Sequence, residues 1–164
     1  MDGSHIELLQ RMPIFGGIRA DILEFLVQTC PSVTVGAGDF FFREGEPGDY
    51  MLVLQRGEAE VLKSWRDEER ALHILKAGDC FGEMAVIDHC PRSASVRALT
   101  DSTAIRISAA DLYKLYSRDL KQFTLIQMNM GREVCRRLRA ADAELFRRMM
   151  ASPGRDSEQA APGD

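Results

Sequence analysis

Turn signals recur so often in the middle of this chain that a long helix is excluded there. Over residues 33–107, short runs rich in Val, Ile, Leu and Phe are separated by turns roughly every 8–12 residues. Each run is long enough for a strand and too short for a helix, which is typical of an all-β sandwich or barrel. The turn signals are Gly36, Gly38, Gly45, Gly48, Gly57, residues 66–69 and Gly78. Three of these glycines precede Asp and an apolar run, which indicates repeated strand entries around a jelly roll.

Helical patterns flank the predicted strands. Apolar residues follow helical spacing over residues 6–12 and 18–30, with a proline and two glycines between the two segments. After the strands, Ser108 is a suitable N-cap for a short helix to Tyr116, and a longer helix is predicted over residues 120–149. We therefore expect a mainly β fold: a double-stranded, jelly-roll-like β-roll with N-terminal helices and a long C-terminal helix.

Length and composition fit one ordinary domain, predicted over residues 6–149. The 164 residues are 45% hydrophobic and 28% charged, and no apolar run approaches the roughly 20 residues that cross a bilayer. The N-terminus lacks the basic start and apolar run of a signal peptide, so we expect a cytoplasmic protein. Residues 151–164 contain no Val, Leu, Ile, Met or aromatic residue and are expected to form a disordered tail.

The charge pattern argues against nucleic-acid binding. The net charge is −4, and the six Arg of residues 132–148 are accompanied by three acids, as on a solvated helix face with pairs four residues apart. Only 15 residues follow Met149, too few for a helix-turn-helix domain. We therefore expect no DNA-binding domain.

The sequence contains no recognisable catalytic or metal-binding pattern. The histidines form no His-x-His or His-x-x-x-His pair of the kind that holds a metal in many β-rolls, and no Ser-His-Asp or Cys-His arrangement can be assembled. The cysteines fit neither a zinc-type pair nor a disulfide framework, so we expect reduced, packing thiols. These residues are His5, His73 and His89, with Cys30, Cys80, Cys90 and Cys135. We expect no enzyme, no catalytic residue, no metal and no cofactor, and an exposed loop position for His89.

The most informative stretch is residues 81–96. It reads Phe81-Gly82-Glu83-Met84-Ala85, a short spacer, then Pro91-Arg92-Ser93-Ala94-Ser95-Val96. A sharp turn at the glycine followed by a short helix would direct free N–H groups at an anion. Arg92 adds a charged fork suited to phosphate, and Ser93 adds a hydroxyl donor. Glu83 fits beside an anion if it accepts sugar hydroxyls and pairs with the Arg. Spacing alone leaves the alternative of a surface salt bridge open.

This stretch resembles the phosphate-binding cassette of cyclic-nucleotide-binding domains, which occur in the bacterial catabolite activator family, protein kinase regulatory subunits and cyclic-nucleotide-gated channels. The turn at residues 43–51 is similar to the family's Glu-Gly-x-x-Gly-Asp turn, and residues 57–61 are similar to its next hairpin. The flanking helices also resemble those of the family, so the likeness extends over residues 6–148.

The resemblance implies roles for individual residues. Arg92 would hold the cyclic phosphate of cAMP or cGMP, Glu83 the ribose 2′-hydroxyl, and the amides around Met84, Ala85 and Ser93 the remaining phosphate oxygens. Phe81, Gly82 and Ala94 complete the expected ligand-binding set. None of these positions departs from the family pattern. Ser at position 93 does not settle the base, because kinase modules with Thr there favour cGMP while the catabolite activator has Ser and uses cAMP.

Two features of the predicted long helix stay open. A gapless alignment places Ala141 and Asp142 where the catabolite activator has a polar pair that reaches the base; Asp142 either accepts hydrogen bonds from guanine or the adenine amine, or faces water. The apolar residues Val134, Leu138, Ala141 and Leu145 follow spacings of 4, 3 and 4, which fit either core packing against the β-roll or a two-helix dimer seam.

The predicted function is a stand-alone cyclic-nucleotide sensor. We expect it to signal by repositioning its C-terminal helix, to form a homodimer through that helix, and to act on an unidentified protein effector. The alternative is a degenerate module of the same fold that makes protein contacts without nucleotide.

Overall fold

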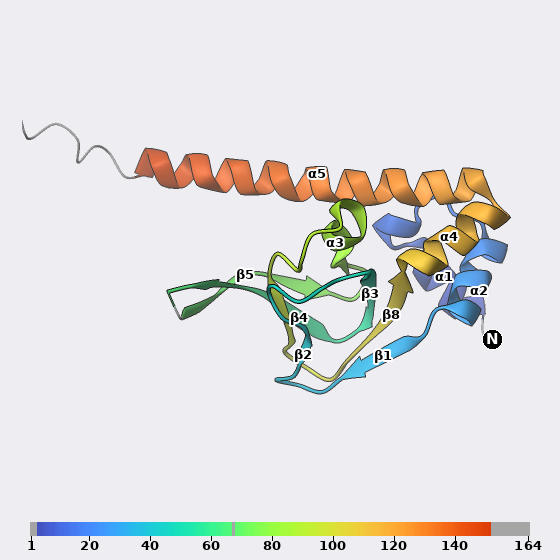
Figure 1. Cartoon of the computed structure of the whole chain (residues 1–164), viewed down its shortest axis with the longest axis horizontal. Coiled ribbons are helices and arrows are strands. Elements are labelled where there is room, and N and C mark those ends of the chain that lie inside the picture. The colour runs from blue at the N-terminus through green and yellow to red at the C-terminus, as the bar shows by residue number, and fades with distance from the viewer. Residues whose placement is uncertain (1–2, 67, 152–164) are drawn as a thin grey trace, which may run out of the picture.

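The computed structural model describes residues 3–66 and 68–151, and Figure 1 shows a β-roll with one long helix lying across it. Two four-stranded antiparallel sheets form the roll. The first sheet has the order β1 (Ser32–Val35), β8 (Ser102–Ser108), β3 (Tyr50–Arg56), β6 (Cys80–Phe81). The second has the order β2 (Phe40–Phe42), β7 (Ser95–Ala98), β4 (Glu58–Trp65), β5 (Glu68–Lys76). The predicted jelly-roll-like fold with flanking helices is confirmed.

Strand β3 contributes side chains to two separate apolar cores, one on each face of its sheet. Its run of four apolar residues is buried on both faces, because alternate side chains of a strand point to opposite sides. Leu52 and Leu54 join the apolar core between the two sheets, whereas Met51 and Val53 join a second core beneath the helices. A continuous apolar run therefore places this strand at the centre of the fold, next to the cassette.

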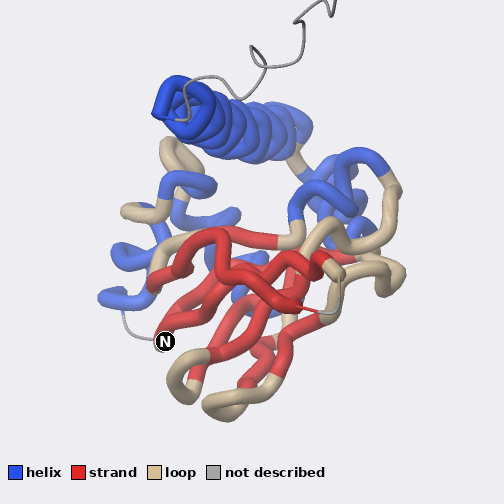
Figure 2. Tube along the Cα trace, turned by 90° about the vertical axis from the view of Figure 1, so that its left-hand side faces the viewer, coloured by secondary structure: helices blue, strands red, loops and turns tan. Residues whose placement is uncertain are grey.

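The shorter helices cover the second core. The chain begins with α1 (Gly3–Gln10), the 3₁₀ turn η1 (Pro13–Phe15) and α2 (Ala20–Thr29), close to the two predicted helices. After β8, α4 (Ala109–Arg118) begins with a capping box in which the Ser108 hydroxyl accepts the Asp111 amide at 3.1 Å, and the Asp111 carboxylate accepts the Ser108 amide at 3.1 Å. The predicted cap at Ser108 is confirmed. Figure 2 shows short helices between the long helix and the strands.

The long helix α5 (Leu120–Ala151) has two different halves. Its first half is anchored: Asn129 donates to the carbonyls of Ile14 and Gly16, each at 3.0 Å, and Met130 is buried. Its second half lies above the β4–β5 hairpin (Figure 1), and Leu138 and Leu145 are each 59% exposed.

The core-packing interpretation of the apolar spacing on α5 is therefore wrong for Leu138, Ala141 and Leu145, which are all exposed. The physical reason is that this half of the helix does not pack closely against the strands: among the described residues of α5, none after Glu133 is buried. Of the predicted disordered tail, Ala151 is the last residue of α5, and residues 152–164 lie outside the described residues. Among the described residues, no helix combines the length and hydropathy needed to span a bilayer.

The four cysteines are free thiols, as predicted. Cys30 and Cys80 are buried, and burial raises the pKa of Cys30 to about 11 and that of Cys80 to about 12, so both stay protonated. Cys90 and Cys135 are exposed. The prediction that all four pack in the interior is wrong for this second pair, because one lies in a surface loop and the other on the outer face of α5.

Candidate functional site

The segment over residues 81–96 folds as strand, turn, short helix, loop and strand. Gly82 has a φ of 76°, a left-handed conformation that glycine adopts without strain, and it turns the chain from β6 into α3 (Glu83–Asp88). His89, with a φ of 57°, ends the helix and is exposed, as predicted. We call residues 81–88 the Glu83 arm and residues 91–96 the Arg92 arm of the cassette.

Arg92 is buried in a cage of aromatic rings. The residue is only 3% exposed. Its guanidinium carbon lies 4.1 Å from the ring centre of Phe42 and 4.4 Å from that of Tyr50. One nitrogen, Nη1, donates to the Gly82 carbonyl at 2.9 Å. Nε and Nη2 are buried and have no hydrogen-bond partner among the described residues. Because buried polar groups are almost always hydrogen-bonded, these two donors are suited to an anion that enters between the arms.

Two glycines make room for this guanidinium. A Cβ on Gly48 would lie 2.6 Å from Arg92 Nε, and one on Gly82 would lie 2.6 Å from Arg92 Nη1. Both distances are far inside van der Waals contact. The Gly-Asp turn before β3 and the glycine that opens the cassette are thus explained by one buried side chain.

The Arg92 arm is fastened to the loop between β2 and β3. The Gly45 amide donates to the Arg92 carbonyl and the Arg92 amide donates to the Glu46 carbonyl, both at 2.9 Å. A third bond of 2.9 Å joins the Glu44 amide to the Ser95 hydroxyl. Backbone hydrogen bonds on both sides of Arg92 therefore fix its position relative to the β-roll.

The Glu83 arm is tied to α5 instead. Glu83 is 1% exposed, and its Oε1 accepts a hydrogen bond of 3.0 Å from Arg137 Nη1. Arg137 also donates to the Cys80 carbonyl and, at 2.9 Å, to Glu133 on its own helix. Burial raises the pKa of the Glu83 carboxyl above its ordinary value, while the charge of Arg137 acts in the opposite direction. Oε2 of Glu83 is buried without a partner among the described residues.

The expected pairing of Glu83 with Arg92 is not what the structure contains. Glu83 pairs with Arg137, and Arg92 donates to a backbone carbonyl. Sequence reasoning missed Arg137 because 54 positions separate the two partners. The available signal was physical: an acid beside an anion site needs a cation of its own, and the arginine-rich part of α5 supplies one.

The other predicted cassette residues lie around these two charges. Phe81 is buried, and its ring centroid lies 5.2 Å from that of Phe41 in an edge-to-face arrangement. Ala85 is buried beside Gly48. Met84 on α3 is 45% exposed, and its sulfur lies 3.8 Å from the Ser93 hydroxyl, so these side chains bridge the arms.

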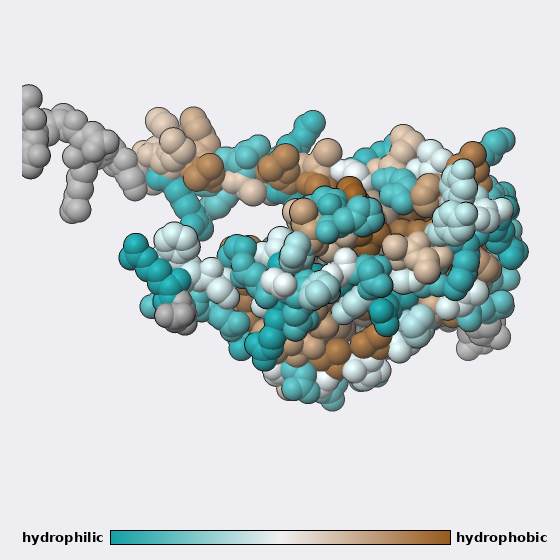
Figure 3. All heavy atoms as spheres, in the orientation of Figure 1, coloured by the Kyte–Doolittle hydropathy of each residue, from teal (hydrophilic) through white to brown (hydrophobic). Residues whose placement is uncertain are grey.

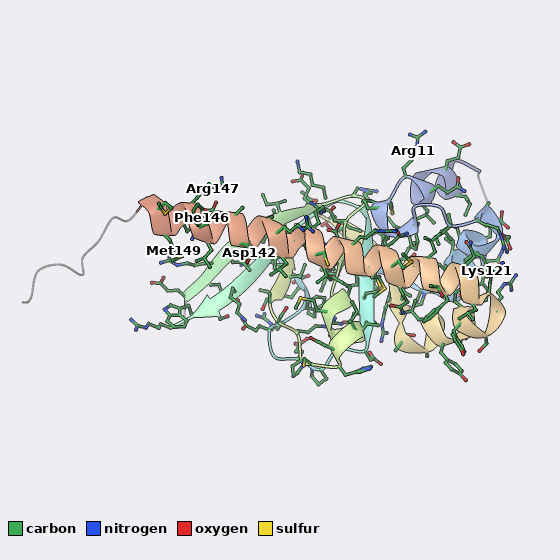
Figure 4. All side chains as sticks on the ribbon, turned by 90° about the horizontal axis from the view of Figure 1, so that it is seen from above. Arg11, Lys121, Asp142, Phe146, Arg147 and Met149 are labelled. Atoms are coloured by element: carbon green, nitrogen blue, oxygen red, sulfur yellow. The ribbon has the colours of Figure 1, made fainter. Side chains whose placement is uncertain are left out.

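Ala94 is half-buried against the core between the sheets. Asp142 stands apart on the exposed part of α5, five residues beyond Arg137 or about 7.5 Å along the helix. Figure 4 shows it on the same half of the helix as Phe146 and Met149. No hydrogen bond or ion pair joins Asp142 to either arm among the described residues.

A hollow lies away from the arms, and the described residues offer no metal site. The part of the chain that the structure describes contains no group of three or more His, Cys, Asp or Glu side chains placed to hold a metal ion. A cavity of about 530 Å³ lies between α3, α4 and α5, and neither Glu83 nor Arg92 lines it. Its walls are Val86, Ala109, Leu112, Tyr113, Tyr116, Phe123 and Gln127.

Comparison with known sequences points to the same region. Residues 32–119 match the family model described as the cyclic nucleotide-binding domain. A cAMP-dependent protein kinase regulatory subunit of Emericella nidulans is 33% identical over 93 residues, which are 57% of this chain and 22% of that subunit. A CRP-like cAMP-activated global transcriptional regulator of Mycobacterium tuberculosis is 28% identical over 155 residues, or 93% of this chain and 67% of the regulator. The chain thus spans less than a quarter of the kinase subunit that it matches.

Solved structures share the fold. A cyclic nucleotide-binding domain from Methylobacillus flagellatus superposes with a TM-score of 0.79 at 24% identity, over 93% of this chain and 85% of that one. The catabolite activator protein of Thermus thermophilus gives a TM-score of 0.72 at 27% identity, over 82% of this chain and 62% of that protein. Both likenesses extend beyond the strands into the flanking helices.

Proposed function

The chain belongs to the cyclic nucleotide-binding domain family, and on that premise we propose that it is a sensor that binds cAMP or cGMP between the two cassette arms. The observation that carries the proposal is the buried guanidinium of Arg92, whose Nε and Nη2 have no hydrogen-bond partner among the described residues and lie in the segment that resembles the family's phosphate-binding cassette. Two parallel N–H donors on one planar cation match the oxygens of a phosphate.

Glu83 supplies the complementary contact in this proposal. One carboxylate oxygen is already held by Arg137, and the second is buried without a partner among the described residues. That second oxygen would accept the ribose 2′-hydroxyl, so binding does not require the ion pair with α5 to break. The amides around Met84, Ala85 and Ser93 would donate to the remaining phosphate oxygens.

The signal would leave the site through α5. Because Glu83 is bonded to Arg137, a ligand that draws the Glu83 arm inward also pulls on the long helix. Binding energy would then bias a helix with two available positions. The proposed output is regulatory rather than catalytic: it uses no cofactor and acts on a protein effector in the cytoplasm.

The test is the thermal midpoint of unfolding with and without nucleotide. A ligand that binds only the folded state stabilises it by mass action, so cAMP or cGMP should raise the midpoint and linear 5′-AMP should not. No shift with either cyclic nucleotide at concentrations of about 1 mM would reject the proposal and favour the degenerate module that makes only protein contacts.

We also propose a homodimer through the second half of α5. Figure 3 shows apolar residues along this overhanging segment, and both Leu138 and Leu145 are 59% exposed. Leu138→Glu would place two charges in the seam and should give monomers, whereas Ala140→Glu, at an exposed position outside the apolar spacing, should leave the dimer intact. Light scattering that finds the unmodified protein monomeric, with and without ligand, would remove this part of the proposal.

The choice of base rests on Asp142 in one version of the proposal. Its carboxylate would accept hydrogen bonds from guanine or from the adenine amine. Asp142→Asn should then change the ratio of the cAMP and cGMP affinities; an unchanged ratio would mean that this side chain faces water.

A further inference from the structure

A lysine outside the cassette contacts the arm that carries Arg92. Lys63 lies on β4, and its ammonium donates to the Ser93 carbonyl at 2.7 Å and to the carboxylate of Glu44. Ser93 is the residue directly after Arg92. A side chain of the β-roll thus reaches the backbone of the arm at the position where phosphate contacts are proposed.

Glu44 holds this lysine in place. Its second carboxylate oxygen accepts the Ser64 amide at 3.0 Å, and its own amide donates to the Ser95 hydroxyl at 2.9 Å. The hydrogen bond from Lys63, reinforced by the Ser64 amide, lowers the pKa of the Glu44 carboxyl, so it stays ionised near neutral pH. Lys63 is therefore oriented by a carboxylate that accepts the Ser64 amide of β4, on a residue whose own backbone amide is bonded to the Arg92 arm.

We propose that Lys63 is a positioning residue for the phosphate end of the ligand, a role that rests on the proposed function. By holding the Ser93 carbonyl, it sets the plane of the peptide that joins Ser93 to Ala94. Because the carbonyl and N–H of a trans peptide point in opposite directions, the Ala94 N–H is turned away from Lys63. The arm then keeps one backbone orientation before the ligand arrives, and less ordering is needed on binding.

The exposure of the pair separates this role from simple stabilisation. The side chains of Lys63 and Glu44 are 48% and 27% exposed. Ion pairs at such positions contribute little to folding, so loss of the lysine should hardly change the unfolding of the ligand-free protein. Its effect should be seen in ligand binding and in the local backbone.

The experiment compares Lys63→Met with the matched control Lys76→Met. Lys76 is an exposed lysine on β5 whose ammonium makes no hydrogen bond or ion pair among the described residues, so the control removes the same charge. Calorimetry should show that Lys63→Met weakens cAMP and cGMP equally, by about threefold to tenfold, as for one hydrogen bond of ordinary net strength. Lys76→Met should change affinity by less than about twofold.

Two ligand-free measurements complete the test. The thermal midpoint of Lys63→Met should stay close to that of the unmodified protein, and its Ala94 amide resonance should shift, whereas Lys76→Met should move neither. A purely electrostatic role of Lys63 would leave the Ala94 amide resonance in place. A purely structural role would lower the thermal midpoint of Lys63→Met.

The outcomes are distinguishable. If the unmodified protein binds neither nucleotide, the proposed function fails and the role of Lys63 in phosphate binding fails with it. If the unmodified protein binds and Lys63→Met behaves like Lys76→Met, the inference about Lys63 is overturned while the proposed function stands.

Discussion

The two arms of the cassette are attached to different parts of the molecule. The Arg92 arm is bonded to the β-roll through the backbone of Gly45 and Glu46 and through the Lys63 ammonium. The Glu83 arm depends on α5, where Arg137 bonds both the Glu83 carboxylate and the backbone of Cys80. The proposed binding site therefore has one arm that is hydrogen-bonded to the β-roll and one arm that is hydrogen-bonded to α5.

This difference assigns separate tasks to the two charges. A fixed cation suits the phosphate, which is common to all cyclic nucleotides and needs a prepared counter-charge. In the proposed function, a carboxylate that is hydrogen-bonded to α5 would suit the contact that reports occupancy, because its movement would pass to the helix through Arg137. The predictions below test each half of this division.

The largest expected effect is on the fixed arm. Arg92→Ala should weaken cAMP and cGMP to the same degree, by about 2–5 kcal/mol, because a desolvated phosphate loses its main counter-charge. The control is Arg97→Ala on β7, directly after the Arg92 arm, where the arginine pairs with Glu60 at 2.6 Å and is 37% exposed, so the loss should stay below about 1 kcal/mol. Calorimetry measures both losses of affinity, and similar losses for the two variants would show that Arg92 is not the counter-charge of the phosphate.

A smaller effect is expected from the glycine that makes room for the guanidinium. In Gly48→Ala the new Cβ would lie 2.6 Å from Arg92 Nε, so the side chain must shift. Overpacking of this kind costs about 1–3 kcal/mol of unfolding free energy, and nucleotide affinity should fall as well. Gly131→Ala on α5 meets no atom within 4 Å and should stabilise the protein slightly. Denaturant titrations measure the free energy of unfolding of both variants. Unchanged nucleotide affinity in Gly48→Ala would mean that binding does not depend on the position of the Arg92 guanidinium.

The smallest expected effect concerns pH and the two acids that Arg137 bonds. Burial raises the pKa of Glu83 above 4.5, so the folded protein holds more protons than the unfolded chain between that value and the raised pKa. The free energy of unfolding should therefore fall as pH rises through this window. Glu133 behaves oppositely: the hydrogen bond from Arg136 lowers its pKa, so its stabilisation is complete above pH 4.5 and is lost as pH falls through the folded-state pKa.

Denaturant titrations over a pH series, with Glu83→Gln and Glu133→Gln beside the unmodified protein, resolve the two contributions. Each difference from the unmodified protein should change with pH only over the window in which the replaced acid titrates. As pH rises, the free energy of unfolding of Glu83→Gln should increase relative to that of the unmodified protein. As pH falls, the free energy of unfolding of Glu133→Gln should increase relative to that of the unmodified protein. Slopes of the same sign for both variants would contradict the assignment of a buried, destabilised carboxylate to the Glu83 arm.

Local signals made much of the fold predictable. The recurring turns between short apolar runs indicated the strands, and Ser108 indicated the start of α4, because both depend on residues close in sequence. The position of Arg92 and Glu83 in one cassette was predictable for the same reason, because both lie in one short segment. Only ten positions separate Arg92 from Gly82, whose carbonyl accepts its hydrogen bond.

Long-range contacts could not be predicted in the same way. The partner of Glu83 lies 54 positions away, and only the packing of α5 on the β-roll brings Arg137 to it. The apolar spacing of Leu138 and Leu145 is the same for a buried face and for an exposed one, and the outcome depends on whether this half of α5 packs against the strands, which local spacing does not contain.

The most direct test of the division between the arms is a double-mutant cycle on the sugar contact. Affinities of cAMP and 2′-deoxy-cAMP are measured for the unmodified protein and for Glu83→Ala, so that any general damage from the loss of the Glu83–Arg137 ion pair cancels between the two ligands. The account predicts that Glu83→Ala weakens cAMP more than 2′-deoxy-cAMP, with a coupling energy of about 1 kcal/mol. A coupling energy near zero would contradict it, because Glu83 would then not read the sugar.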